Sequence, residues 1–548
     1  MRSSTRRWGV LLLVLSTGGA GCHSSSTSPT RMEDAGHTGV SESAVAAAAT
    51  DSPADSPAST ETSAIVAESD APTASNSPAS NVPLVEELKL FDGWGKPEVA
   101  LFVTGQQKGY IEPCGCAGLA NQKGGLARRH TLVRELKNKG WPLLTLDVGN
   151  QVRRFGRQAE LKFQITVEGL KTIGYDAITF GENDLALSVG EVAAATMAVD
   201  EQGTPFLCAN AAVLDRSLTP RFRILEAGGK KIGVTAVLGT AEQEKVTSTE
   251  VVLQPVVESL NEVVPQLKEA NCDLYVLLAH ASLDESRKIA QQFPDFDVIV
   301  SSGGLGDPTY EPEAIEGSQA ILVQVGVKGM FAGVIGVFAD AEKPLRYQRV
   351  PLDASYTDSP EMLASLKAYQ DQLKITGLDG LGVNQVPHSS GNKFVGSQAC
   401  ADCHSTAFSI WEKTPHAHAT DTLVHPGERS QIERHFDPEC LSCHVTGWSP
   451  QSFFPYQSGY LGLEQTPALV GNGCENCHGP GSAHVAAELG DVDASDEMLA
   501  TLRQAMRLPL NKAEDKCREC HDLDNDPDFQ KDGAFDRYWP KVEHKGLD

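Results

Sequence analysis

Basic residues are scarce in this chain of 548 residues: Lys and Arg number 46, against 72 Asp and Glu, and the formal net charge is −26 at pH 7. Nucleic acids favour proteins with basic surfaces, so this balance argues against nucleic acid as a partner. An acidic surface instead keeps a protein soluble and can steer it toward a basic partner. The length is sufficient for two or three domains with sizeable cores.

Long apolar runs are also missing, because beyond the N-terminus no segment is apolar for long enough to cross a bilayer. The first residues contain three arginines and then an apolar run over 8–15, which is too short for a spanning helix and is typical of an export signal. Small residues precede Cys22, and this order resembles a bacterial lipoprotein signal, in which the cysteine is lipidated. Gly19 departs from the leucine usual at that place, so cleavage without lipidation is the alternative. We predict a signal over 1–21, export to the periplasm or a cell-envelope membrane, and a lipid anchor at Cys22.

Large apolar side chains are almost absent from residues 22–85, where Ser, Thr, Ala, Pro, Asp and Glu dominate, as in "DSPADSPASTETS". Such a segment cannot bury enough apolar surface to offset the entropy lost on ordering. We predict a disordered tether that lets the folded part stand away from a membrane.

Residues 86–385 show the alternation that is typical of an α/β domain. Short apolar runs such as "EVALFVTG", "PLLTLDVGN", "DLYVLLAH" and "DVIVSSG" alternate with helical patterns, of which "GGLARRHTLVRELKNKG" is one. The stretch "FRILEAGGKKIGVTAVLG" predicts a hairpin that turns at Gly228 and Gly229. The pattern therefore predicts an α/β domain with a mixed or parallel sheet.

Several of these stretches carry a more specific resemblance. In order, "VTGQQKGYIEP", "LLTLDVGN", "IGYDAITFGEND", "LLAHASLDE" and "FDVIVSSGG" resemble the landmarks of the 5′-nucleotidase group of calcineurin-like metallophosphoesterases. The resemblance implies a layered α/β sandwich. It also implies two metal ions, which in that family hold a phosphate and activate water.

The residues that stand at the family's metal-ligand positions have mostly the wrong chemistry in this chain. A lysine repels a metal ion, and the lost carboxylates leave too little negative charge for two cations. Only His280 remains a plausible ligand, so we predict a catalytically inactive domain that serves docking or ligand binding. By the resemblance, the family's opening Asp and His correspond to Gln106 and Lys108, its bridging Asp to Asn150, its Asn-His-Glu to Glu182, Asn183 and Asp184, and its Gly-His-x-His to Gly303 and Leu305.

Cys114 and Cys116, in the Gly-rich stretch "YIEPCGCAGLANQKGG", have no counterpart in that family pattern. A mutual disulfide across one residue would be strained. The two thiols are a candidate redox or metal-binding pair, and pairing with other cysteines or a plain structural role are the alternatives.

The last part of the chain, residues 386–548, repeats one motif four times. Cys-x-x-Cys-His is the attachment sequence for c-type haem: two thiols reach the two vinyl groups of one porphyrin, and the next residue places an imidazole on the iron. A zinc ribbon does not need a histidine directly after each pair, and a redox dithiol needs one copy. We therefore predict four haem c groups. The covalent attachment sites are Cys400 and Cys403, Cys440 and Cys443, Cys474 and Cys477, and Cys517 and Cys520, with proximal ligands His404, His444, His478 and His521.

Four haems in so short a region leave little room for a core of side chains alone. The porphyrins are therefore expected to form much of this core, surrounded by short helices and irregular segments. Methionine is rare here, with only Met498 and Met506, whereas histidine is frequent. This favours two histidines on each iron, an arrangement that generally lowers the reduction potential relative to His/Met ligation.

This region resembles the tetrahaem cytochrome c-554 family over about residues 394–525, through "VGSQACADCHSTAFSIWEKTPHAHATDTL", "CLSCHVTGW" and "CENCHGPGSAHV". The resemblance implies distal ligands at the histidine of His-Ala-x-Ala and at the histidine after Cys-His-Gly-Pro-Gly, which are His416 and His484. It also implies that one iron can lack a sixth ligand. The remaining distal candidates are His418, a near rival of His416, then His435, and after it His425 and His544.

Three functions are compatible with these features. The first is an exported cytochrome that relays electrons between redox partner proteins of the cell envelope. The second is a haem enzyme that converts a small nitrogen or sulfur compound at a five-coordinate iron, and the third is a sensor whose α/β cleft binds an anionic ligand. Phosphatase activity is the weakest interpretation.

Overall fold

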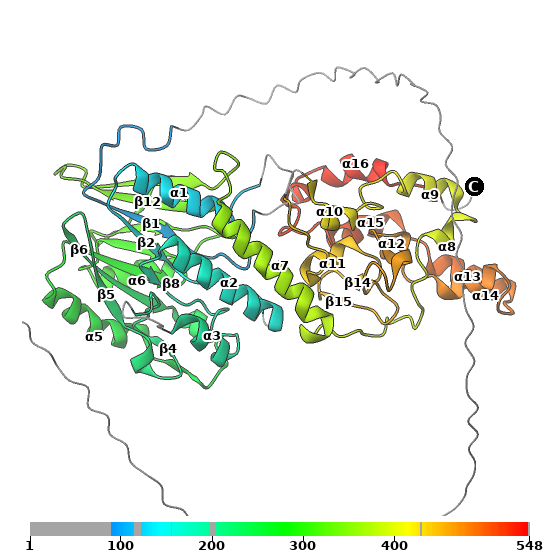
Figure 1. Cartoon of the computed structure of the whole chain (residues 1–548), viewed down its shortest axis with the longest axis horizontal. Coiled ribbons are helices and arrows are strands. Elements are labelled where there is room, and N and C mark those ends of the chain that lie inside the picture. Colours follow the sequence, from blue (N-terminus) through cyan, green and yellow to red (C-terminus); the bar gives the residue numbers. More distant parts are fainter. Residues whose placement is uncertain (1–88, 114–121, 155, 198–202, 428–429, 546–548) are drawn as a thin grey trace, which may run out of the picture. The chain divides into compact units, whose positions relative to one another are not determined.

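The computed structural model describes residues 89–113, 122–154, 156–197, 203–427 and 430–545 (Figure 1). They belong to one compact unit, Val85–Asp548. The predicted signal, the lipidation site Cys22, the tether, and the pair Cys114 and Cys116 lie outside the described residues. Among the helices that are described, none combines the length and apolarity that a membrane span requires.

The first sheet of the α/β part is mixed and has five strands in the order β13-β12-β1-β2-β3. Strands β1, β2 and β3 run parallel, and β12 and β13 are antiparallel to their neighbours. The bounds are β1 Val99–Thr104, β2 Leu143–Asp147, β3 Ala177–Ile178, β12 Phe331–Val337 and β13 Leu345–Pro351.

The second sheet has six strands in the order β10-β11-β9-β8-β6-β5. Its centre is parallel, and the predicted hairpin joins β5 to β6 through Gly228 and Gly229, both with positive φ. The bounds are β5 Phe222–Ala227, β6 Lys230–Leu238, β8 Leu274–His280, β9 Val298–Ser301, β10 Glu313–Ala314 and β11 Ile321–Gln324; a separate pair joins β4 Ala211–Val213 and β7 Val251–Leu253.

The two sheets face each other across an apolar layer. Leu101 and Val103 of β1 share this layer with Val234 of β6 and Val276 of β8, whereas the alternate residue Phe102 packs into the helix-covered core on the other face, as the period of two in a strand requires. The predicted layered α/β sandwich is therefore confirmed. Its helices are α1 Leu126–Asn138, α2 Arg157–Ile173, α3 Val189–Thr196, α4 Thr240–Gln243, η2 Arg216–Leu218, α5 Val256–Glu269, α6 Leu283–Gln292 and α7 Pro360–Gly380.

The remaining part contains short helices and irregular segments, as predicted. Its apolar side-chain core is small and centres on Leu441, Val445, Trp448 and Tyr460. The bounds are α8 Gln398–Ala401, α9 Ser405–Trp411, α10 Asp421–Val424, α11 Pro438–His444, β14 Trp448–Ser449, β15 Phe454–Pro455, η4 Pro467–Leu469, α12 Cys474–His478, α13 Ser482–Glu488, α14 Asp496–Ala505, α15 Leu510–Arg518, η5 Pro527–Gln530, α16 Ala534–Tyr538 and η6 Trp539–Lys541.

One buried carboxylate ties several of these segments together. Glu475, inside the third Cys-x-x-Cys-His motif, accepts hydrogen bonds from the backbone N–H groups of Val395, Gly396 and Gly481. Burial raises the pKa of Glu475. The third motif therefore holds neighbouring segments together through Glu475, in addition to providing two thiols.

Candidate haem-binding site

Two of the four motifs lie on short helices, and the first and fourth begin at the ends of α8 and α15 and continue into the turns that follow. The second motif ends α11, and the third forms the whole of α12. Residues three apart lie on the same side of a helical turn, so both thiols of a motif can reach one side of a porphyrin. The N-terminus of α11 is fixed because Asp437 accepts the backbone N–H of Glu439 at 2.9 Å.

Three of the proximal histidines each lie opposite another histidine. The ring centres are 6.3 Å apart for His404 and His484, 6.0 Å for His521 and His416, and 5.6 Å for His478 and His544. A metal–imidazole bond is about 2.0 Å long, and two such bonds plus two ring radii span roughly this distance. The described residues therefore fit irons held between histidine pairs.

The hydrogen bonds of these rings also fit ligation. The Nδ1 atoms of His478 and His544 donate to the backbone oxygens of Met506 and Val542, at 2.8 and 2.9 Å, which leaves Nε2 available on each ring. Burial, reinforced by neighbouring His521 and His444, lowers the pKa of His416 to about 4. His416 is thus neutral, the form in which imidazole binds a metal.

The other candidate histidines lie elsewhere. His418 is largely exposed, with Nε2 3.1 Å from the backbone oxygen of Glu412 and Nδ1 3.5 Å from Asp421. His435 packs on Phe436 at a ring separation of 3.8 Å. As distal ligands, His418 and His435 stay predictions from the sequence. The geometry favours His544 as the histidine opposite His478. His544 follows no recognisable local motif, so its sequence signal was only its residue type.

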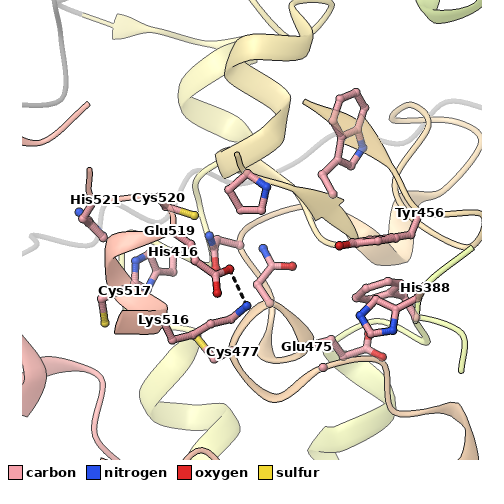
Figure 2. A pocket seen from close by; sticks show the side chains of 16 residues that line it. His388, His416, Tyr456, Glu475, Cys477, Lys516, Cys517, Glu519, Cys520 and His521 are labelled. Carbon is pink, nitrogen blue, oxygen red and sulfur yellow. Dashed lines mark hydrogen bonds and ion pairs between the residues drawn. The ribbon is translucent and has the colours of Figure 1, made fainter. Parts of the chain in front are cut away.

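A cavity opens beside the fourth motif (Figure 2). It encloses about 700 Å³ of space that protein atoms do not fill, part of it open to solvent. His416 and His521 line it together with Cys517 and Cys520, and Figure 2 shows these four side chains gathered at one end.

The thiols bring the motifs together in two pairs. A hydrogen bond with Cys400 lowers the pKa of Cys474 to about 7, and a hydrogen bond with Cys520 lowers that of Cys443. The first motif therefore adjoins the third, and the second adjoins the fourth. Neighbouring attachment sites of this kind place their cofactors close to each other.

Several residues that the family resemblance places at metal-ligand positions contact one another. His280 uses both ring nitrogens: Nε2 lies 2.7 Å from Glu182, and Nδ1 contacts the backbone oxygen of Val148. Burial alone would raise the pKa of Glu182, but His280 holds it at about 2. Asp184 accepts the backbone N–H groups of Asn150 and Gly181, and burial raises its pKa to about 7.

Three residues at these positions hold a backbone conformation that is uncommon for residues with a Cβ. Gln106, Lys108 and Asn150 have φ values of 52°, 52° and 60°. Within the described ranges, no group of three or more His, Cys, Asp or Glu side chains is arranged to hold a metal ion. The loops keep a strained form, while Lys108 stands where the family resemblance places a ligand.

The α/β part contacts the second motif through a polar cluster. Lys162 of α2 is buried and lies 2.8 Å from Glu439, and Arg154 lies 3.0 Å from the same carboxylate. Gln158 donates to Asp437 at 2.6 Å. Glu439 directly precedes Cys440, so these contacts hold the start of the haem-attachment helix.

A second set of contacts reaches the segment after the fourth motif. Lys328 donates to the backbone oxygens of Leu523 and Asp524, at 3.4 and 2.9 Å, and lies 3.1 Å from the Asp524 carboxylate, which also pairs with Arg153. The charge of Asp524 also acts on Lys108. No pattern in the sequence singled out these residues, because the pairs join positions far apart in the chain.

These features define a c-type haem region joined to a phosphoesterase-like α/β sandwich. Residues 399–479 match the family described as cytochrome c554 and c-prime. Cytochrome c-554 of Nitrosomonas europaea is 27% identical over 170 residues, which cover 28% of this chain and 68% of that protein. The match supports a cytochrome with covalently bound haem c; the fourth motif lies beyond the residues that match the family model.

The α/β part is similar to apyrases and 5′-nucleotidases. An apyrase of Tabanus yao is 23% identical over 305 residues, covering 50% of this chain and 54% of that protein. The structure of a 5′-nucleotidase precursor from Thermus thermophilus has a TM-score of 0.44 at 19% identity, over 59% of this chain and 68% of that one. The chain spans about half the length of the apyrases that it matches.

Proposed function

We propose that this protein is an exported electron-transfer cytochrome with four haem c groups. The observation that carries the proposal is the set of three histidine pairs, each of which contains the proximal histidine of a Cys-x-x-Cys-His motif. Haem c supplies one-electron transfer when it is bound. The cysteine pairs attach the four porphyrins, and the pairing of motifs one with three and two with four supports short distances between them.

The chain's own residues orient and protect these sites. His484, His416 and His544 are the distal ligands in this proposal, opposite His404, His521 and His478. Backbone oxygens hold the His478 and His544 rings in one orientation. Bonds of this kind around a ligand set its basicity and hence the potential of the metal.

The α/β part has a docking role within the chain in this proposal. Its cations Lys162, Arg154, Arg153 and Lys328 bind carboxylates beside the second and fourth motifs. The cleft that resembles a two-metal site is catalytically inactive, because Lys108 and the Glu182–His280 pair occupy it. Export and a lipid anchor at Cys22 would place the protein beside redox partners of the cell envelope.

The matured protein is expected to carry four covalent haems. Intact-mass spectrometry of the purified holoprotein is expected to show four haem additions, and the double variant Cys517→Ser, Cys520→Ser three. Three additions in the wild type, with Cys517 and Cys520 as free thiols, would overturn the count of four. Carbon monoxide added to the reduced wild type then tests the alternative function, a haem enzyme with a five-coordinate iron. A haem that binds carbon monoxide would favour this alternative.

Phosphate-ester hydrolysis is expected to be absent. With added Mn²⁺ or Zn²⁺, phosphate release from a nucleoside 5′-phosphate is expected to stay at the level of the uncatalysed reaction, since Lys108 repels a cation and His280 is already bound to Glu182. An active 5′-nucleotidase in parallel checks the assay. Metal-dependent release that a chelator abolishes would refute the inactive cleft.

A further inference from the structure

The proximal histidine of the fourth motif has a ring partner of a different kind from those of the second and third. The Nδ1 atoms of His444 and His478 contact the backbone oxygens of Ala419 and Met506, both at 2.8 Å. For His521 the partner is the carboxylate of Asp526, with Oδ2 2.8 Å from Nδ1. A carboxylate carries a full negative charge and a carbonyl does not.

Asp526 is held firmly in this position. Its other oxygen, Oδ1, accepts the backbone N–H of Phe529 at 3.2 Å, which caps the 3-10 helix η5. Phe529 is buried, and its ring stacks on that of His521 with centres 4.9 Å apart and planes 25° from parallel. One short segment therefore orients the imidazole from its edge and from its face.

The tautomer of His521 follows from this contact. An ionised carboxylate only accepts hydrogen bonds, so Nδ1 of His521 carries the proton and Nε2 is left for the iron. A carboxylate on the outer nitrogen of a ligating histidine raises the basicity of the ligand. A more basic ligand stabilises the ferric state over the ferrous state and so lowers the reduction potential.

We propose that Asp526 is a positioning residue that lowers the reduction potential of the haem attached at Cys517 and Cys520. This inference rests on the proposed function, because it requires a haem at the fourth motif. The other acidic residues of the segment act differently. Asp522 accepts the backbone N–H of Asn525, and Asp524 pairs with Lys328 and Arg153.

The test is spectroelectrochemical titration of Asp526→Asn beside the wild type and Asp522→Asn. Asparagine can keep the cap on Phe529 while removing the charge from the imidazole. One of the four midpoint potentials is expected to rise in Asp526→Asn, and the low-spin electron paramagnetic resonance signal of the same haem is expected to change its g values. Asp522→Asn removes an equal charge nearby without touching the ring, so its shift is expected to be much smaller. Asp526→Glu is expected to restore the potential in part.

Mass spectrometry of each variant distinguishes a failure of the four-haem proposal from a failure of the proposed role of Asp526. If the fourth motif carries no haem, the proposed count fails and the inference falls with it. If four haems are present and Asp526→Asn leaves every potential unchanged, or shifts it no more than Asp522→Asn does, the tuning role of Asp526 is wrong while the cytochrome stands.

Discussion

Replacement of His416 by alanine is expected to convert one low-spin haem into a high-spin haem that binds carbon monoxide. His416 is half-buried beside the fourth motif, and its ring centre lies 6.0 Å from that of His521. In the proposed function, removing the side chain would leave His521 as the one protein ligand of this haem. Electron paramagnetic resonance of the oxidised protein and carbon monoxide difference spectra of the reduced protein, both compared with the wild type, measure the change.

His418 provides a matched control two residues away. Its side chain is 60% exposed and contacts Asp421 and Glu412, so His418→Ala is expected to leave all spin states as in the wild type. Added imidazole is expected to return the His416→Ala haem to low spin, because it can occupy the place of the lost ring. Unchanged spectra for His416→Ala, or the spectral change in His418→Ala instead, would show that the ligand assignment is wrong.

The sequence was sufficient for the α/β class because its strands and helices follow local patterns, whereas the layered sandwich was predicted through the family resemblance. The apolar run of β1 and the helical pattern of α1 are short-range signals, as is the hairpin at Gly228 and Gly229. In the haem region the small core around Trp448 and Tyr460 agrees with the expectation that cofactors complete it. Such features depend on residues close together in the chain.

The distal side of each motif depends on tertiary structure, which explains why local reasoning ranked His544 last and did not find Asp526. His416 and His484 were predicted through their flanking residues, whereas His544 reaches His478 from the end of the chain. The same holds for Asp526, since an acidic residue five positions after a haem histidine has no distinctive spacing. Only the cap on η5 shows why this carboxylate meets the ring.

The residues at the metal-ligand positions of the family resemblance keep an unusual backbone. Gln106, Lys108 and Asn150 have positive φ values, a conformation that costs free energy in residues other than glycine. Two cationic side chains of the α/β part, Lys328 and Arg153, form ion pairs with Asp524, which follows the fourth motif. In the proposed function, the α/β part thereby changes from holding metal ions to holding the haem segments.

Replacement of Lys162 by methionine is expected to destabilise the protein by about 3 kcal/mol, the lower end of the cost of removing one partner from a buried ion pair. The Lys162 side chain is 7% exposed and that of Glu439 29%, so the carboxylate keeps some contact with water and with Arg154. Guanidinium unfolding of the holoprotein, followed by far-ultraviolet circular dichroism and Soret absorbance, measures the change. Lys171→Met on the same helix removes a pair with the exposed Glu168 and a hydrogen bond to the backbone oxygen of Ala195, and is expected to cost about 1 kcal/mol.

The stability that the Lys162–Glu439 pair contributes is expected to depend on pH. Burial alone would raise the pKa of Glu439, but Lys162 and Arg154 hold it at about 2, below the ordinary value of about 4.3. The stabilisation from Glu439 is therefore complete above about pH 4.3 and is lost as the pH falls toward 2. Without Lys162 the carboxyl group of Glu439 takes up its proton at higher pH, so the variant is expected to lose stability at a higher pH on acidification.

In a double-mutant cycle, Lys162→Met combined with Glu439→Gln is expected to cost less than the sum of the single changes. Strict additivity would show that Lys162 acts elsewhere. A cost equal to that of Lys171→Met would show that the pair beside the second motif stabilises the protein no more than the contacts of Lys171 do.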